Sequence, residues 1–301
     1  MRDIHRLEAS LSNETLGADT FNRDLHRFLG RQDILLSFDP GVKGYRITRG
    51  TDCTPAKHLS EGEKTAIAFI YFMTKLEERG NKVAESIIVI DDPVSSFDAN
   101  HVFHAFAFLR TKCSEPRQLF VFTHSFGFFR LVRDWLKGKN KKDKEPKSQF
   151  YVVQIPVLAP RRAVLMRADD TLIGYNSEYH YLYARLHSYI TTAQLSVDAA
   201  FMTANLARKL LETFLSFKFP RKRHDFALLI EAGVKDPVKR ERVYRFVNKY
   251  SHALFVPTDE AAADIVVGES GDIVAQVFSI IQELDPVHYD EMQAVVEEKD
   301  G

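Results

Sequence analysis

The stretch "IIVIDDPVSSFDANH", residues 87–101, indicates the fold of the surrounding chain. Four β-branched apolar residues run into Asp91 and Asp92, and a proline, two serines and Asp98 follow. A short, wholly apolar run is typical of a strand buried on both faces of a parallel sheet. Carboxylates at the end of such a strand are suited to hold Mg²⁺. The stretch therefore predicts a buried strand with a polar, metal-binding end.

Strands and helices alternate on both sides of this stretch. We predict helices at residues 18–29, 59–80, 99–110 and 126–137, and strands at 33–39, 44–50, 118–125, 149–155 and 161–168. Ser60 followed by Glu63 forms a capping box that starts the second helix, and Gly80 is expected to end it. This alternation favours an α/β fold for residues 1–168. Successive amphipathic helices follow, which predicts an all-helical domain at 169–301.

The composition narrows the classes of function. Of 301 residues, 45% are apolar, which suffices for a packed core. The formal net charge is zero, so any site for nucleic acid must be a local one. Cys53 and Cys113 lack metal-ligand spacing and fit a reducing compartment. No apolar run approaches the roughly 20 residues that span a bilayer, so we expect a cytoplasmic protein with no membrane partner.

Three polar features follow one another along the first domain. Ser60 and Gly62 stand at a helix N-terminus, where free N–H groups can bind a terminal phosphate. Asp91 can hold Mg²⁺ directly or through water, and Asp92 can polarise an attacking water. His124 ends the next strand, where it can touch a γ-phosphate. Each feature alone is more often structural, but their order together predicts a nucleotide site.

The set resembles the C-terminal half of an ABC-type ATPase. The matches are Leu59–Glu63 with the signature motif (which includes Ser60, Gly62 and Glu63), Ile87–Asp92 with the Walker B strand, Ser95–Asp98 with the D-loop, and His124 with the switch histidine. The resemblance implies ATP and Mg²⁺ as cofactors and closure of the signature of one subunit over ATP held by another. Asp92 stands where most of that family carries Glu, and the shorter acid implies slow hydrolysis.

The phosphate loop that should accompany these motifs is absent from the sequence. Gly138-Lys139 is the only Gly-Lys pair, but Arg133 and Asn140 occupy the flanking positions that G-x-x-x-x-G-K-[ST] assigns to Gly and to Ser or Thr. We therefore expect a homodimer or another chain that supplies the Walker A half, or a chain that is the C-terminal portion of a longer protein. Alone, it is expected to bind ATP poorly.

Two stretches of the helical domain carry a second candidate site. Arg208 and Glu212 share a helix face, and His252 follows Asn248 by one turn on another helix. In most proteins such residues form an ion pair and a core histidine. With the ATPase half, however, they resemble the anticodon nucleases of bacterial phage defence (the PrrC and RloC type), whose Arg-x-x-x-Glu pair and later His form a proposed RNase triad. The resemblance implies tRNA as substrate, 2′,3′-cyclic phosphate products and no metal in the RNase step.

Two other functions remain open. The helical domain can instead be a docking platform for a separate effector or for DNA, with Arg208, Glu212 and His252 only holding helices together. A DNA-repair or chromosome-associated ATPase is the third possibility, but it needs a long coiled coil, and the sequence has no sustained heptads. Cations for an RNA backbone are available in the segments 220–224 and 235–245.

Overall fold

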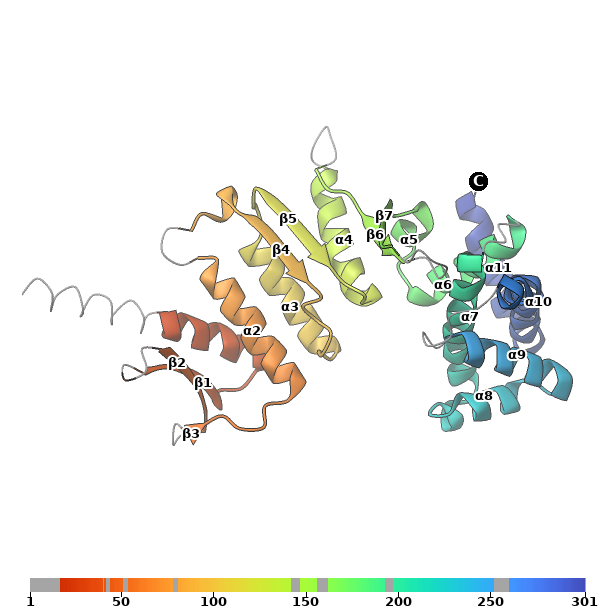
Figure 1. The fold of residues 1–301 in the computed structure, drawn as a ribbon, viewed down its shortest axis with the longest axis horizontal. Coiled ribbons are helices and arrows are strands. Elements are labelled where there is room, and N and C mark those ends of the chain that lie inside the picture. The colour runs from red at the N-terminus through yellow and green to blue at the C-terminus, as the bar shows by residue number, and fades with distance from the viewer. Residues whose placement is uncertain are drawn as a thin grey trace, which may run out of the picture. The chain divides into compact units, whose positions relative to one another are not determined.

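The computed structural model describes residues 17–39, 41, 44–50, 54–77, 81–141, 147–155, 162–192, 197–251 and 260–300. The chain divides into two compact units, Met1–Lys147 and Ser148–Gly301 (Figure 1). Strands and helices alternate in the first unit, and helices dominate the second. The predicted class, α/β followed by a helical region, is confirmed.

The first unit contains two small sheets and the helices that pack on them. After a helix at residues 17–29, its elements are β1 (Ile34–Asp39), β2 (Gly44–Arg49), β3 (Thr54–Pro55), α2 (Glu61–Lys75), η1 (Val83–Glu85), β4 (Ile87–Asp91), α3 (Ala99–Lys112), β5 (Gln118–Phe122) and α4 (Phe126–Asn140). Strands β1, β2 and β3 form an antiparallel sheet, while β4 and β5 pair in parallel. Asp91 lies opposite Phe122, so the polar ends of β4 and β5 meet at one edge.

One apolar core joins the elements of the first unit. The helix at 17–29 contributes Phe28, α2 contributes Ile70, β4 contributes Ile88, α3 contributes Leu109, and α4 contributes Phe128. All five side chains are at most 2% exposed. Burial of each large apolar side chain contributes about 1.5–3 kcal/mol, so this cluster fixes the helices against one face of the β4–β5 sheet.

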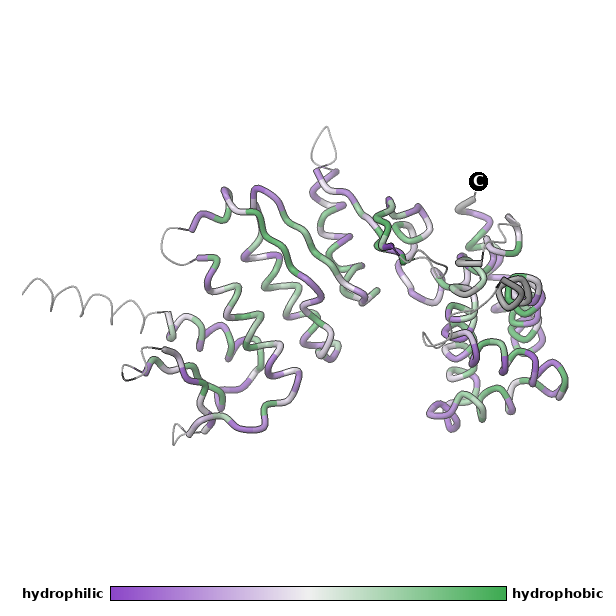
Figure 2. Tube along the Cα trace, viewed as in Figure 1, coloured by the Kyte–Doolittle hydropathy of each residue, from purple (hydrophilic) through white to green (hydrophobic). Residues whose placement is uncertain are grey.

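The other face of the β4–β5 sheet is uncovered in the described part of the chain. Ile88 and Ile90 are buried, but Ile87 is 58% and Val89 is 55% exposed. Phe120 and Phe122 of β5 are also exposed. The prediction of a strand buried on both faces is therefore wrong for these residues. Alternate side chains point to opposite faces, and helices cover only one of them (Figure 2 shows how apolar both strands are).

Helix α2 begins as predicted but ends earlier. Ser60 and Glu63 form the reciprocal capping box. The helix ends at Lys75, ahead of Gly80, which lies outside the described residues. Gly138 and Lys139 lie inside α4, so this Gly-Lys pair belongs to a helix and not to a strand–loop–helix phosphate loop.

The second unit is a hairpin followed by a helical bundle. Its elements are β6 (Tyr151–Gln154), β7 (Val164–Arg167), α5 (Asp170–Gly174), α6 (Glu178–Thr191), α7 (Val197–Lys218), η2 (Pro220–Lys222), α8 (Phe226–Gly233), α9 (Pro237–Ser251), α10 (Glu260–Leu284) and α11 (Pro286–Asp300). Strands β6 and β7 are antiparallel. The structure thus divides the chain ahead of this hairpin, whereas the sequence led us to place the hairpin in the first domain.

Helix α7 forms the centre of the bundle. Its residues Ala207, Leu210 and Leu211 are fully buried, and α7 packs against α6, α9 and α10. No helix among the described residues is both long enough and apolar enough to cross a membrane.

Candidate functional site

The N-terminus of α2 is built by the capping box that the sequence predicts. The Ser60 hydroxyl accepts the N–H of Glu63 at 3.2 Å, and Glu63 Oε2 accepts the N–H of Ser60 at 2.7 Å. The N–H groups of Glu61 and Gly62 have no partner within the helix, because the first turn lacks preceding carbonyl groups. Two donors therefore remain for an anion at this end of α2.

Glu63 has a second set of partners that the sequence did not reveal. Its Oε1 accepts hydrogen bonds from Arg31 and from Arg49, the latter at 2.7 Å. The residue is 8% exposed. Burial works to raise the pKa of Glu63, but the bonds from Ser60, Arg31 and Arg49 outweigh it and hold the pKa below its usual range. Glu63 therefore serves as a charged cap, while its predicted nucleotide contact stays a prediction.

Gly62 lies against the turn that follows β4. A Cβ atom at this position would lie 3.1 Å from the carbonyl oxygen of Ser96, tighter than ordinary contact. The absence of a side chain therefore allows the start of α2 to approach the segment 93–96 closely. The structure thereby brings the predicted signature and D-loop segments side by side.

Asp92 and His124 meet where β4 and β5 end. His124 Nδ1 lies 2.6 Å from Asp92 Oδ2, and the Thr123 hydroxyl donates to Asp92 Oδ1 at 3.2 Å. The Asp92 N–H donates to the carbonyl of Phe122 at 2.9 Å, which continues the strand pairing by one bond. The two residues, each predicted separately for the nucleotide site, are therefore in direct contact.

The backbone of Asp92 adopts the left-handed region, with φ of 41°. Non-glycine residues there cost about 1–3 kcal/mol and occur disproportionately at functional sites. Asp tolerates this region better than most residues because its short side chain makes local hydrogen bonds. The bonds to Phe122, Thr123 and His124 hold Asp92 in this conformation.

Asp91 ends β4 with an exposed side chain. Among the described residues, no three His, Cys, Asp or Glu side chains gather into a metal-binding group. A nucleotide-bound Mg²⁺ needs only one or two protein carboxylates, since water and phosphate oxygens complete its shell. One carboxylate at this edge therefore fits the ion, and the assignment of Asp91 stays a prediction.

Asp98 caps α3 and faces solvent. Its Oδ1 accepts both the N–H and the ring Nδ1 of His101, each at 2.9 Å. These bonds, the backbone one first, hold the pKa of Asp98 below its usual range. Asp98 is thus charged and held in place, but the described residues include no contact between it and Asp92 or His124.

In the second unit, Arg208 links two helices. Its guanidinium donates to the Asn248 side chain on α9, and Nε lies 3.9 Å from Glu212 Oε2. The guanidinium also lies over the ring of Phe226, 5.1 Å from its centroid. The structure therefore brings Arg208 and Glu212 next to the last turn of α9. His252 lies outside the described residues.

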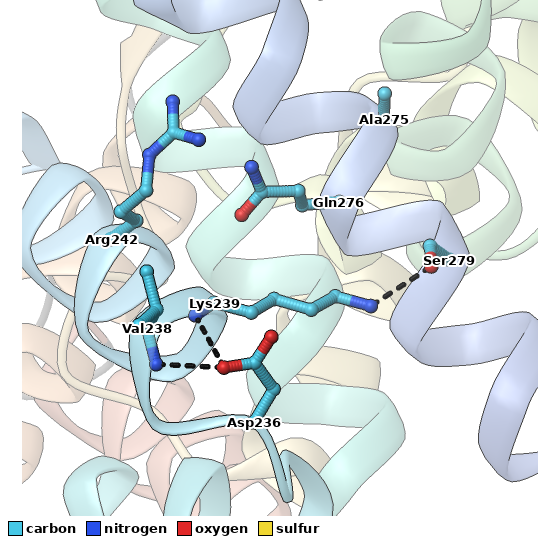
Figure 3. A pocket seen from close by; sticks show the side chains of 7 residues that line it. All are labelled: Asp236, Val238, Lys239, Arg242, Ala275, Gln276 and Ser279. Carbon is cyan, nitrogen blue, oxygen red and sulfur yellow. Dashed lines mark hydrogen bonds between the residues drawn. The ribbon is translucent and has the colours of Figure 1, made fainter.

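A groove between α9 and α10 contains part of the predicted basic segment. It is open to solvent, has a volume of about 420 Å³, and is lined by Lys239 and Arg242 from α9 and Gln276 and Ser279 from α10, among others (Figure 3). Lys239 Nζ lies 2.8 Å from both Ser279 Oγ and Glu283 Oε1. Lys239 thus links α9 to α10 through these two bonds. Arg242, with 48% of its side chain exposed, is the more accessible cation.

Sequence reasoning missed Arg31, Arg49 and Thr123. Arg31 and Arg49 are separated from Glu63 by 32 and 14 positions, and they reach it only because β1 and β2 pair beside α2. Thr123 directly precedes the predicted histidine, and a polar residue at the end of a strand was the one available signal.

Comparison with known proteins places the chain in a family. Residues 1–279 match the family model described as an AAA domain. An uncharacterized chromosomal cassette SCCmec type IVc protein of Staphylococcus aureus strain MRSA252 is 36% identical over 89 residues, which are 28% of this chain and 13% of that protein. A protein of the same description from Staphylococcus aureus matches equally. The chain thus covers a small part of the length of these relatives. Because the family model matches most of its residues, the chain belongs to the AAA domain family of ATPase-type proteins.

Proposed function

We propose that the first unit hydrolyses ATP as one side of a composite site, whose phosphate loop comes from another segment or a second chain. The contact between Asp92 and His124 carries this proposal. It lies where parallel strands end, the edge at which α/β proteins bind ligands. The open N-terminus of α2, beside the turn at Ser96, adds donors for a phosphate.

The side chains at this edge suit the chemistry of phosphate hydrolysis. Each Asp92 oxygen has two lone pairs, so its bonds to Thr123 and His124 leave room to accept a proton from water. His124 is 74% exposed, and with Nδ1 turned to Asp92 its Nε2 is free to face a phosphate oxygen. When bound at Asp91, Mg²⁺ would neutralise phosphate charge.

The uncovered face of the β4–β5 sheet is consistent with a second chain or segment that completes the site. Parallel sheets are normally covered on both faces. Ile87, Val89, Phe120 and Phe122 instead present apolar side chains to solvent. A chain or segment carrying the phosphate loop would bury this face when it completes the site.

Phosphate release from Mg²⁺-ATP by the protein in its native assembly tests the proposal. His124→Ala should reduce the rate by about 10²-fold or more, the size of effect expected when a group that acts in the transition state is removed. His224→Ala changes an exposed histidine of the second unit and should leave the rate unchanged. Hydrolysis by His124→Ala at the wild-type rate would rule out the proposed role of this contact.

We also propose that the helical unit cleaves tRNA under control of the nucleotide. The bond between Arg208 and Asn248 supports this candidate, because it sets an Arg–Glu pair beside the helix that directly precedes His252 in the sequence. A His and a Glu can move protons while a ribose 2′-OH attacks the neighbouring phosphate, and an Arg can stabilise the developing charge.

Incubation of tRNA with the native protein and ATP tests the nuclease proposal. Wild type should yield fragments ending in a 2′,3′-cyclic phosphate, and Arg208→Ala and His252→Ala should not. Lys209→Ala, a change at the exposed neighbouring lysine, is the matched control. Equal cleavage by all variants, or none under any nucleotide condition, would contradict the proposal. Recovery of a stoichiometric partner without cleavage would instead favour a docking platform.

A further inference from the structure

The Thr123 hydroxyl lies in a short hydrogen-bond chain that joins the start of α4 to Asp92. Ser125, the N-cap residue of α4, donates its N–H to Thr123 Oγ1 at 3.1 Å. Thr123 in turn donates to Asp92 Oδ1 at 3.2 Å. Since a hydroxyl has one hydrogen, the bond from Ser125 occupies a lone pair of Oγ1 and leaves that hydrogen for Asp92. The chain therefore directs the Thr123 hydroxyl at one oxygen of Asp92.

The two oxygens of Asp92 have different partners, and both partners directly follow β5. Oδ1 accepts the Thr123 hydroxyl, and Oδ2 lies 2.6 Å from His124 Nδ1. The torsion that rotates an Asp carboxyl group has broad minima, so the torsion alone restricts its orientation little. These two contacts therefore set the orientation of the Asp92 carboxylate, and Thr123 provides one of them.

The neighbouring carboxylate of Asp91 lacks such restraints. Its side chain is exposed at the end of β4, and the part of the chain that the structure describes provides no hydrogen bond or ion pair to it. Two consecutive carboxylates thus differ in freedom: Asp91 can turn to a metal ion, while Asp92 is held toward the end of β5.

The backbone of Asp92 has a restraint of its own. Its N–H donates to the carbonyl of Phe122 at 2.9 Å, a bond that does not involve the side chain of Thr123. The Thr123 hydroxyl bonds the Asp92 side chain instead. Loss of that hydroxyl would leave the pairing of β4 with β5 in place and would release the carboxylate.

We propose that Thr123 is a positioning residue for the carboxylate of Asp92 that activates water. Its hydroxyl holds this carboxylate in one orientation toward the attacking water and leaves Asp91 as the carboxylate for Mg²⁺. Orientation matters because small errors in the placement of reacting groups cost large factors in rate. The inference deepens the proposed ATPase function and rests on it, since it concerns the same site.

Thr123→Val tests the inference, because Val keeps the branched shape of Thr and lacks the hydroxyl. The readout is phosphate release from Mg²⁺-ATP by the protein in its native assembly. The folded variant should lose about 10-fold or more in kcat. Its KM for ATP and its dependence on Mg²⁺ concentration should match wild type, because Thr123 acts through Asp92.

Two further variants serve as controls. Thr123→Ser keeps the hydroxyl and should retain most of the wild-type kcat. Thr111→Val is the matched control, since Thr111 is an exposed threonine of α3 whose hydroxyl donates to the carbonyl of Ala107. Its kcat should equal that of wild type.

The same change in the Asp92→Asn background separates positioning from a purely structural role. If Thr123 acts through Asp92, adding Thr123→Val to Asp92→Asn should lower kcat by less than about two-fold, because residues that act as a unit are not additive. A threonine that only supports the fold would lower kcat by the same factor in both backgrounds.

The outcomes distinguish this inference from the proposed function. Wild-type kcat in folded Thr123→Val, or an equal loss in Thr123→Ser and Thr123→Val, would overturn the role of Thr123 and leave ATP hydrolysis intact. If Thr123→Val does not fold, Thr123→Ala removes the same hydroxyl and is judged against Thr123→Ser by the same criteria. If the wild-type assembly releases no phosphate from ATP, the proposed function fails and the inference fails with it.

Discussion

Replacement of Glu63 by Gln should destabilise the first unit while it keeps the helix cap. The change removes the negative charge that Arg31 and Arg49 share. Hydrogen bonds to charged groups contribute about 1.5–3 kcal/mol each, but both arginines are more than a third exposed, which lowers their share. We expect a loss of about 2 kcal/mol in the free energy of unfolding at pH 7.

Fluorescence of Trp135 during urea unfolding measures this loss. Trp135 is the only tryptophan and lies in the first unit, so its signal reports that unit alone. The melting temperature should fall by about 5 °C for a unit of this size. Glu61→Gln is the matched control, since Glu61 is 75% exposed and its ion pair among the described residues is with Lys64. Its effect on the free energy of unfolding should stay below about 0.5 kcal/mol.

The dependence on pH has a defined sign. The pKa of Glu63 is lower in the folded chain than its usual value. Its contribution is therefore present above the unfolded pKa, about 4.3, and is lost as pH falls through the folded value. The difference between wild type and Glu63→Gln should be constant near pH 7 and shrink below about pH 4. A difference under 0.5 kcal/mol at pH 7, or one that grows on acidification, would refute this reasoning.

Three further changes have expected results. Gly62→Ala should change the free energy of unfolding of the first unit by less than about 1 kcal/mol, because Ala favours a helix while its Cβ crowds Ser96. The same variant should nevertheless hydrolyse ATP much more slowly than wild type. Asp92→Val should lower the free energy of unfolding by about 1–3 kcal/mol more than Asp92→Asn does, because a β-branched residue fits the left-handed backbone poorly. Equal melting temperatures of the two variants would contradict this. Arg208→Lys should lower the free energy of unfolding of the second unit by about 1 kcal/mol, because its bond to Asn248 is lost. In circular-dichroism melts, the control variant Lys209→Ala should unfold at the same temperature as wild type.

Local signals in the sequence predicted most elements of the fold. Ser60 and Glu63 predicted the start of α2 because a capping box involves only neighbouring residues. The apolar run at 87–90 predicted a strand in a parallel pair, but it could not show that one face lacks a cover. An uninterrupted apolar run has the same sequence pattern whether the second face of its strand is covered by the same chain or by another component.

The candidate site was predictable only in part. Asp92 and His124 were each predicted for the nucleotide site, but their contact depends on the parallel pairing of β4 with β5, which the sequence alone did not show. The hydrogen bonds of Arg31 and Arg49 to Glu63 depend on pairing between β1 and β2 and on packing beside α2. No local sequence pattern encodes these long-range contacts. The left-handed backbone of Asp92 likewise arises from its bonds to Phe122 and Thr123.

The central claim is that Asp92 activates water in a composite ATPase site. Asn has the size of Asp and also tolerates the left-handed backbone, so Asp92→Asn removes charge with little change in structure. The decisive measurement is the rate of phosphate release from Mg²⁺-ATP by the native protein with and without Asp92→Asn. If Asp92 activates water, the rate should fall by about 10²-fold or more in the folded variant. Hydrolysis at the wild-type rate would contradict it.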